Sequence, residues 1–344
     1  MKLFSRFLSH LSDLVFLSLL VLALVSCHDE EQRKQQLLLK GNEALDHQDF
    51  EQAVFYYEQA ARLDSCFGSA YNNIGTAYLR SGRPELALEW YRRAVDCSPE
   101  SEFLLNRANA YFDSRAYDSA LSDIDKVLRH SPDSVPALAL KGVVLSALHR
   151  YHEAESLFDR ILTTNPDQAD HWVNRAVLRF QTKRLPEARQ DLEQALSIDS
   201  LHADALNTMA MVEAEAGNAQ NGLKWVVKAL AKSPNHPFYL NNRGWIRVLL
   251  NRLDEAEQDI QSSLAIAPEN PWAMRNRGLI LLMRSDADGA AQWFVKALAL
   301  DPETDRVRHL MGIALHRQGK TAEGCRMLLD FTADPVLGFR NPCR

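Results

Sequence analysis

The chain has 344 residues, of which 46% are hydrophobic and 24% charged, and its formal net charge is −6. The apolar fraction is ordinary for a folded protein, and the length alone would allow two or three globular domains. A mildly acidic chain without a basic tract is a poor candidate for nucleic-acid binding.

Residues 1–26 have the pattern of a secretory signal peptide. Lys2 and Arg6 give a positively charged start, and residues 14–25 form an apolar run interrupted by one serine. The run is too short for a helix that spans a membrane and fits the hydrophobic region of a leader. We therefore expect residues 1–26 to be a leader that is not part of the fold.

The apolar run ends in Leu24-Val25-Ser26-Cys27, which resembles a bacterial lipobox. The resemblance implies cleavage before Cys27 and acylation of Cys27, with residues 27–33 as a short tether. Several acyl chains on one cysteine would hold the protein firmly on a membrane, because one chain alone binds only marginally. The alternative is an uncleaved anchor with an incidental cysteine.

The residues after Cys27 indicate which membrane such a lipoprotein would occupy. In enteric bacteria an aspartate directly after the lipidated cysteine favours retention in the inner membrane, and here that place is taken by His28. The acidic run that follows resembles the surface-export signals of some lipoproteins. We therefore predict an outer-membrane lipoprotein of the bacterial cell envelope, with the periplasmic and surface leaflets both open.

A pattern of small residues recurs along the rest of the chain at a step of 34 residues, with a single step of 33. In the clearest copy, residues 68–101, Gly75 and Ala87 stand where two helices would cross and would let their backbones approach closely. Aromatic residues at helical spacing would fill the space beside them: Tyr71, Tyr78 and Tyr91. The residue that matches Gly75 returns at Gly41, Ala108, Gly142, Ala176, Ala210, Gly244, Gly278 and Gly312.

This order of aromatic, small and proline positions resembles the tetratricopeptide repeat. We count nine repeats, starting near Lys34, Gly68, Ser101, Val135, Ala169, Ala203, Pro237, Pro271 and Asp305. The resemblance implies an all-α fold, an α-solenoid of about nine helix–turn–helix repeats that forms a right-handed superhelix. The array would cover residues 34–338 as one continuous domain, and residues 339–344 would be a C-terminal tail across its end.

Two repeats depart from the pattern. In repeat six, Gly222 replaces the usual alanine of the second helix, and Glu213 stands where an aromatic residue is usual. An interior glycine costs about 1 kcal/mol relative to alanine, so we expect this helix to be looser. In repeat nine we expect Asp334-Pro335 to end the last helix, because terminal repeats must cap an open core.

Four arginines directly precede the small residue of a first helix: Arg107, Arg175, Arg243 and Arg277. Three of these repeats carry an acid at one position of the second helix: Asp123, Asp191 and Asp259. We predict that each Arg pairs with the Asp of its own repeat. Arg277 meets Trp293 at that position, which suggests stacking of guanidinium on indole. The alternative is a functional role for these arginines.

Four cysteines remain after Cys27, and an envelope location permits disulfides. Cys66 and Cys97 could join neighbouring repeats, whereas Cys325 and Cys343 could fasten the tail to the last helix pair. Free buried thiols are the alternative in both cases. The cysteine spacing fits no metal site, and we expect neither a metal nor a cofactor.

The first helix of each repeat lines the concave face in this family, and its sixth position is often asparagine here: Asn73, Asn106, Asn174, Asn242 and Asn276. Such a ladder resembles the groove of O-linked N-acetylglucosamine transferase, which implies that the amides hold the backbone of an extended peptide. Leu140, Thr208 and Leu310 interrupt the ladder. The alternative is that each asparagine bonds locally to the neighbouring helix.

The same face becomes aromatic and basic in the late repeats, which contribute Phe238, Trp245, Trp272, Arg275, Arg306 and His309. Aromatic residues and arginine are enriched in binding hot spots. Trp245 and Trp272 lie outside the usual core positions of the family, so we expect both to be exposed. We predict that this end of the groove contacts a ligand, with packing between first helices as the alternative.

No glycine-rich phosphate loop, nucleophile elbow or acid pair outside the repeats is present, so we do not expect an enzyme. The leading hypothesis is a membrane-anchored scaffold that binds a peptide or protein segment in its concave groove and acts as an adaptor in envelope assembly. The alternative is a structural spacer or a self-associating array.

Overall fold

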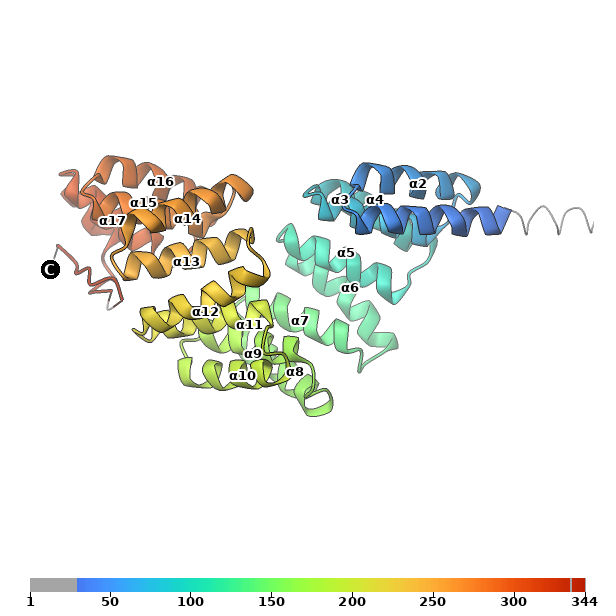
Figure 1. Cartoon of the computed structure of the whole chain (residues 1–344), viewed down its shortest axis with the longest axis horizontal. Coiled ribbons are helices and arrows are strands. Elements are labelled where there is room, and N and C mark those ends of the chain that lie inside the picture. The colour runs from blue at the N-terminus through green and yellow to red at the C-terminus, as the bar shows by residue number, and fades with distance from the viewer. Residues whose placement is uncertain (1–29, 335, 344) are drawn as a thin grey trace, which may run out of the picture. The chain divides into compact units, whose positions relative to one another are not determined.

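The structure is a computed structural model that describes residues 30–334 and 336–343, and these form helices joined by short turns (Figure 1). One isolated β-bridge pairs Ala333 with Arg340. The predicted signal peptide and its lipidation site, Cys27, lie outside the described residues. Residues 30–33 of the predicted tether are already helical. Within the described ranges, no helix has the length and apolar character that a membrane span requires.

The chain divides into two compact units, and the division falls between Leu157 and Phe158. The first unit contains a helix over residues 30–46, followed by α2 (Phe50–Leu63), α3 (Gly68–Arg80), α4 (Pro84–Cys97), α5 (Ser101–Asp113), α6 (Tyr117–His130) and α7 (Val135–Ala147). The division falls within α8 (Tyr151–Thr164).

The second unit contains ten complete helices among its described residues. They are α9 (Ala169–Gln181), α10 (Leu185–Ile198), α11 (Ala203–Glu215), α12 (Ala219–Lys232), α13 (Pro237–Leu249), α14 (Leu253–Ile266), α15 (Pro271–Met283), α16 (Ala287–Leu300), α17 (Val307–Arg317) and α18 (Thr321–Met327). The first helices of repeats two to eight begin at the predicted residues. The all-α repeat solenoid is therefore confirmed.

Each turn between the two helices of a repeat contains one residue in the left-handed conformation. Three of these residues are glycines, Gly82, Gly217 and Gly319, for which a positive φ carries no steric penalty. The corresponding turns of other repeats use Gln48, Arg115, His149, Lys183, Asn251 and Ser285. The shared conformation gives the repeats the same sharp reversal without requiring the same residue.

The small residues of the first helices accommodate large residues of the second helices, as the sequence predicts. A Cβ atom on Gly75 would lie 2.8 Å from the Tyr91 ring, and one on Gly278 would lie 2.6 Å from the Phe294 ring. Both rings are buried. Missing side chains on one helix therefore make room for the aromatic core of the next.

Repeat six is packed more tightly than the sequence suggests. A Cβ atom on Gly222 would lie 2.7 Å from the carbonyl oxygen of Ala210, so the absent side chain lets α12 approach α11. Glu213 is buried and forms an ion pair with Arg189 of α10. The expectation of a looser helix is therefore wrong, because Gly222 serves close packing.

Repeat nine begins later and ends earlier than predicted. Arg306, the residue before α17, has a left-handed φ of 64°, and α18 ends at Met327 rather than near Asp334. The side-chain amide of Asn341 donates to the carbonyl oxygens of Leu328 and Phe331 at 2.9 and 2.8 Å. These bonds replace those that a longer helix would make, and they dock the tail on the last repeat.

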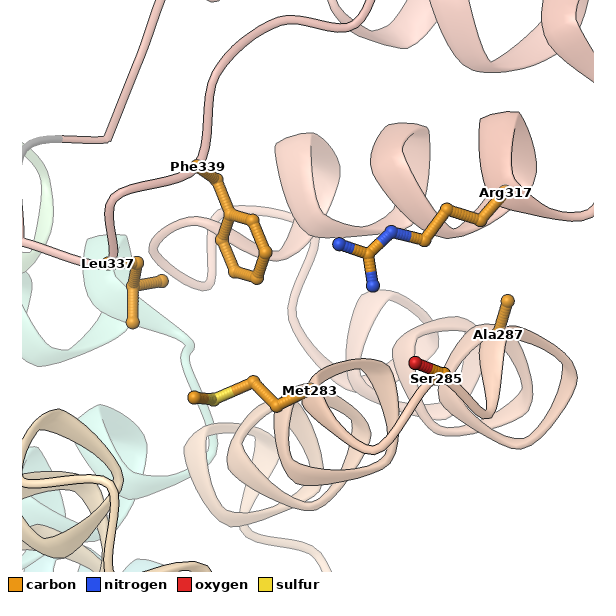
Figure 2. A pocket seen from close by; sticks show the side chains of 6 residues that line it. All are labelled: Met283, Ser285, Ala287, Arg317, Leu337 and Phe339. Carbon is orange, nitrogen blue, oxygen red and sulfur yellow. The ribbon is translucent and has the colours of Figure 1, made fainter.

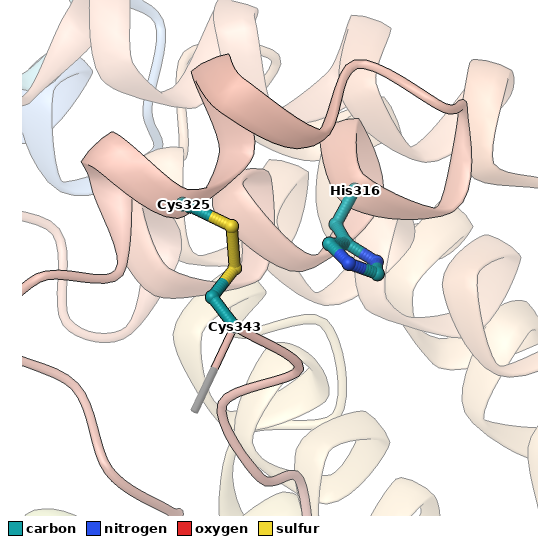
Figure 3. Close-up of side chains that lie close together, drawn as sticks. All are labelled: His316, Cys325 and Cys343. Atoms are coloured by element: carbon teal, nitrogen blue, oxygen red, sulfur yellow. A yellow bond between two sulfur atoms is a disulfide. The ribbon is translucent and has the colours of Figure 1, made fainter.

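Both disulfides that the sequence left open are present. Cys66 and Cys97 join the loop before α3 to the end of α4, with 5.3 Å between their Cα atoms. Cys325 and Cys343 join α18 to the tail, with 5.7 Å between Cα atoms (Figure 3). The alternative of free thiols is wrong for all four residues.

Candidate functional site

The predicted Arg–Asp pairs form in all three repeats. In each pair the Nε and Nη2 atoms of arginine donate to the two carboxylate oxygens of aspartate at 2.6–3.0 Å. Burial disfavours the charged Asp123 carboxylate, but Arg107 and Lys126 outweigh it, and the pKa of Asp123 lies below its ordinary value. The pairs hold the two helices of a repeat together, so these arginines belong to the packing and not to a binding site.

The fourth arginine behaves differently from the prediction. Arg277 pairs with Glu257, and the cation that lies over the Trp293 ring, 4.4 Å from its centroid, is Lys296. An acid of the preceding repeat therefore satisfies Arg277, and stacking on Trp293 was the wrong expectation.

The asparagines of the first unit bond to one another. The Nδ2 atom of Asn106 donates to Oδ1 of Asn72 at 2.9 Å, and Asn72 in turn donates to Asn73 at 3.2 Å. Asn73 donates to Asn42 at 3.1 Å. Each link joins first helices of adjacent repeats or neighbours on one helix, which is the local bonding that the sequence left open.

The second unit repeats this arrangement. Asn242 donates to Asn207 at 3.0 Å, Asn241 donates to Asn242 at 3.3 Å, and Asn276 donates to Asn241 at 2.8 Å. Asn276 is fully buried, so it cannot contact a ligand in this conformation. Asn174 of α9 is half-buried, and in the repeat register it falls between the two interruptions of the ladder at Leu140 and Thr208.

Trp245 is buried rather than exposed. Only 1% of its surface is accessible, because Arg275 and Arg306 lie over its ring with 4.7 and 5.3 Å between guanidinium carbon and ring centroid. Arg275 is itself buried and donates through Nε to Asn276 at 3.0 Å. Burial lowers the pKa of Arg275 to about 10. The Trp245 ring therefore packs against two arginines of its own chain and is not available to a ligand.

Arg306 is the second cation over the Trp245 ring, and three carboxylates bind it. It donates to Oε1 of Glu215 and to Oδ2 of Asp334, both at 2.7 Å, and to Oδ2 of Asp305 at 2.5 Å. Burial opposes its charge, but the three carboxylates outweigh it and raise the pKa of Arg306 above its ordinary value. His309, the last predicted contact, is half-buried and stacks on Phe331 at 4.7 Å.

The structure thus brings the predicted late-repeat residues together, but most of them contact one another. Trp272 and Phe238 are the exceptions, because Trp272 is 39% exposed and Phe238 is also exposed. The Trp272 ring lies 6.3 Å from that of Phe238, which is 45% exposed, in an edge-to-face arrangement. Two large aromatic side chains therefore remain accessible on adjacent first helices.

These two residues belong to a periodic set on α9, α11, α13 and α15. The second residue of each of these helices is exposed, and we call the four the acidic–aromatic row: Asp170, Asp204, Phe238 and Trp272. Asp170 contacts Nε2 of His202 at 3.0 Å, and Asp204 accepts from the Tyr239 hydroxyl at 2.5 Å. The row passes from two carboxylates to two aromatic rings along the second unit.

A pocket of about 530 Å³ lies elsewhere in the second unit, between the turn after α15 and the tail (Figure 2). Its walls are formed by Met283, Ser285, Ala287, Arg317, Leu337 and Phe339. Arg317 donates to the carbonyl oxygen of Leu282 at 2.8 Å and lies 5.7 Å from the Phe339 ring centroid. The pocket is a gap left where the tail packs on the repeats.

The helix order and the periodic surface define an α-helical repeat solenoid, a class of protein that presents an extended binding surface. A tetratricopeptide repeat model matches residues 38–102, 140–203 and 244–305, which together exceed half of the chain, and a second such model matches residues 306–329. The chain therefore belongs to the tetratricopeptide repeat family, whose members are typically non-catalytic and mediate protein–protein interactions.

Relatives share only part of the chain. Sperm-associated antigen 1 of Rattus norvegicus is 36% identical over 97 residues, and RNA polymerase II-associated protein 3 of the same species is 30% identical over 98 residues. Each match covers 28% of this chain, and the chain spans 11% and 15% of the lengths of these two relatives. A chain in the crystal structure of the APC/C hetero-tetramer Cut9–Hcn1 is similar at a TM-score of 0.60 and 17% identity, and the match covers 88% of this chain and 67% of that chain. This last likeness shows the fold alone.

Proposed function

We propose that this protein is a scaffold that binds an extended protein segment along the acidic–aromatic row. The observation that carries the proposal is the exposed edge-to-face pair of Phe238 and Trp272 on adjacent first helices. Solvent-exposed aromatic pairs of this kind are anchors for apolar side chains of a partner. The carboxylates of Asp170 and Asp204 extend the surface, so the segment carries basic residues beside its apolar ones.

The acidic–aromatic row differs from a groove centred on the asparagine ladder. Asn276, Arg275 and Trp245 are buried under contacts within the chain, so they stabilise the scaffold below the binding surface. The partner reaches the row without displacing them.

We further propose that the scaffold is a lipoprotein of the bacterial outer membrane, attached through Cys27, and that it acts as an adaptor in envelope assembly. The lipobox-like sequence that ends at Cys27 supports this part of the proposal. A Cys27→Ser variant should leave the membrane fraction of envelope preparations and lose incorporation of labelled fatty acid. If the variant stays in the membrane fraction with its label, the anchor is not Cys27.

The binding surface is tested by capture from solubilised envelopes with Phe238→Ala/Trp272→Ala beside the wild type. The matched control is Val227→Ala/Val295→Ala, which removes two exposed apolar side chains from the second helices α12 and α16. A photo-crosslinking residue at position 272 identifies the protein that touches the row. We expect one partner to be retained by the wild type and the control and lost by the aromatic variant.

One combined result would overturn the proposal. Identical captures from the aromatic variant and the wild type, together with no crosslink at position 272, would remove the row from function. A size that rises with protein concentration in the same samples would then favour the alternative, a self-associating array.

A further inference from the structure

The disulfide that fastens the tail lies beside an imidazole. His316 of α17, Cys325 of α18 and Cys343 of the tail place one ring nitrogen and two sulfurs within 4.8 Å of one another (Figure 3). Throughout the described ranges, this is the one group of three or more His, Cys, Asp or Glu side chains that meets that distance. The side chain of Cys343 is exposed, so a reductant in solvent can reach the bond.

We propose that reduction of the Cys325–Cys343 disulfide creates a Zn²⁺ site formed by the two thiolates and His316. A dithiol reductant attacks one sulfur and forms a mixed disulfide, and its second thiol then resolves that bond. The reductant leaves as its own disulfide, and Cys325 and Cys343 gain two electrons and two protons. Zn²⁺ then binds both sulfurs and the neutral imidazole, and the two thiol protons pass to solvent.

The donor set selects the metal. Thiolate and imidazole ligands favour Zn²⁺ over Mg²⁺ or Ca²⁺, which prefer oxygen. Tetrahedral zinc sites have Zn–S distances of about 2.3 Å and Zn–N distances of about 2.0 Å, so their ligand atoms lie roughly 3.3–3.8 Å apart. The three atoms are already within 4.8 Å, and opening of the S–S bond lets the sulfurs separate to fit the ion. Water would complete the coordination, as in other sites with three protein ligands.

The tail keeps Cys343 in place after the disulfide opens. The buried Asn341 amide donates to the Leu328 and Phe331 carbonyls, and its Oδ1 atom accepts from the Cys343 amide at 2.9 Å. The Asp334 carboxylate binds Arg306 and so holds the chain beside the Ala333–Arg340 bridge that leads to the tail. Because none of these contacts involves sulfur, reduction leaves the three ligands gathered. The tail is then fastened by a covalent bond when oxidised and by the metal ion when reduced.

The test uses the full chain in a Cys27→Ser background, reduced with a dithiol that is removed before titration with Zn²⁺ against a chromophoric chelator. We expect about one Zn²⁺ per reduced chain and none for the oxidised chain. Co²⁺ as a probe should give thiolate-to-metal charge-transfer absorption in the reduced chain alone. His316→Ala should weaken Zn²⁺ binding at least about ten-fold, because it removes one of three protein ligands.

The second disulfide is the internal control. Cys66→Ser/Cys97→Ser should bind Zn²⁺ like the parent, whereas Cys325→Ser/Cys343→Ser should not bind, with circular dichroism showing that both variants are helical. Absence of stoichiometric Zn²⁺ and of the Co²⁺ band in the reduced parent would overturn the proposal without reliance on any variant. Unchanged affinity in His316→Ala would also overturn it, because the site would then lack the imidazole.

Discussion

Asp191 and Asp159 bind the same arginine but differ in burial, so they should contribute differently to the free energy of unfolding. Both carboxylates accept a hydrogen bond at 2.7 Å from Arg175. The Asp191 side chain is 2% exposed and also binds Arg179, whereas the Asp159 side chain is 54% exposed. The same guanidinium therefore makes one buried and one solvated ion pair.

We expect Asp191→Asn to lower the free energy of unfolding by about 3 kcal/mol, because it removes the buried carboxylate that Arg175 and Arg179 share and leaves Arg175 with the exposed Asp159. Asp159→Asn should cost no more than about 1 kcal/mol, since water screens the exposed pair. Urea denaturation followed by circular dichroism measures both. Equal losses in the two variants would contradict the assignment of Asp191 as a buried structural acid.

His236 gives the second unit a sensitivity to acid. Its ring stacks on Tyr239 at 3.8 Å, and its buried Nδ1 atom makes no hydrogen bond within the described chain. Burial lowers the pKa of His236, and nearby Asp204 only partly offsets that effect. As pH falls below about 6.5, the unfolded chain takes up the proton first, so the free energy of unfolding decreases.

His236→Phe keeps the ring stack and removes the titrating group. We therefore expect thermal melts between about pH 7.5 and pH 5 to show a shallower loss of stability than in the wild type. The control His47→Phe makes the same substitution at an exposed position and should follow the wild-type slope. A His236→Phe slope that matches the wild type would exclude a role for this imidazole.

At the scale of helices, α11 and α12 pack closely because Gly222 has no side chain. Intrinsic propensity alone predicts that alanine in place of Gly222 would stabilise the helix by about 1 kcal/mol. The packing predicts the opposite sign, because the added Cβ would lie 2.7 Å from the Ala210 carbonyl oxygen. Backbone atoms cannot move aside as a flexible side chain would.

We expect Gly222→Ala to destabilise the chain by about 1–3 kcal/mol, which is the usual cost of overpacking. Asn221→Ala, on the exposed face of the same helix, isolates the propensity effect and should be neutral or slightly stabilising. Chemical denaturation of both variants compares the two signs. Stabilisation by Gly222→Ala would show that α11 and α12 are free to separate.

Helix positions and pairings within one repeat could be predicted because they depend on short spacings. Arg107 and Asp123 are 16 residues apart, and the same spacing recurs in two other repeats. The burial of Trp245 could not be predicted, because Arg275 and Arg306 come from the two following repeats. The partner of Arg277 was missed for the same reason, since Glu257 belongs to the preceding repeat.

At the scale of the whole molecule, most contacts of a repeat array join neighbouring repeats, so stability is close to a sum of local terms. Arg306 departs from that rule in the second unit, because it binds Glu215, which is 91 residues earlier in the sequence. It also binds Asp334 of the tail. One side chain therefore links repeat six, repeat nine and the tail, and it couples elements that would otherwise unfold separately.

We expect Arg306→Gln to lower the free energy of unfolding by about 3 kcal/mol, because Asp334 would lose this cation and Glu215 would keep only its ion pair with the exposed Lys183. Unfolding of the second unit should also become less cooperative. Hydrogen exchange should therefore accelerate in both α11 and α17, although these helices are three repeats apart. The exposed Arg308→Gln removes an equal charge nearby and should leave both helices protected. Acceleration confined to α17 would show that the second unit unfolds repeat by repeat and that Arg306 caps only its own helix.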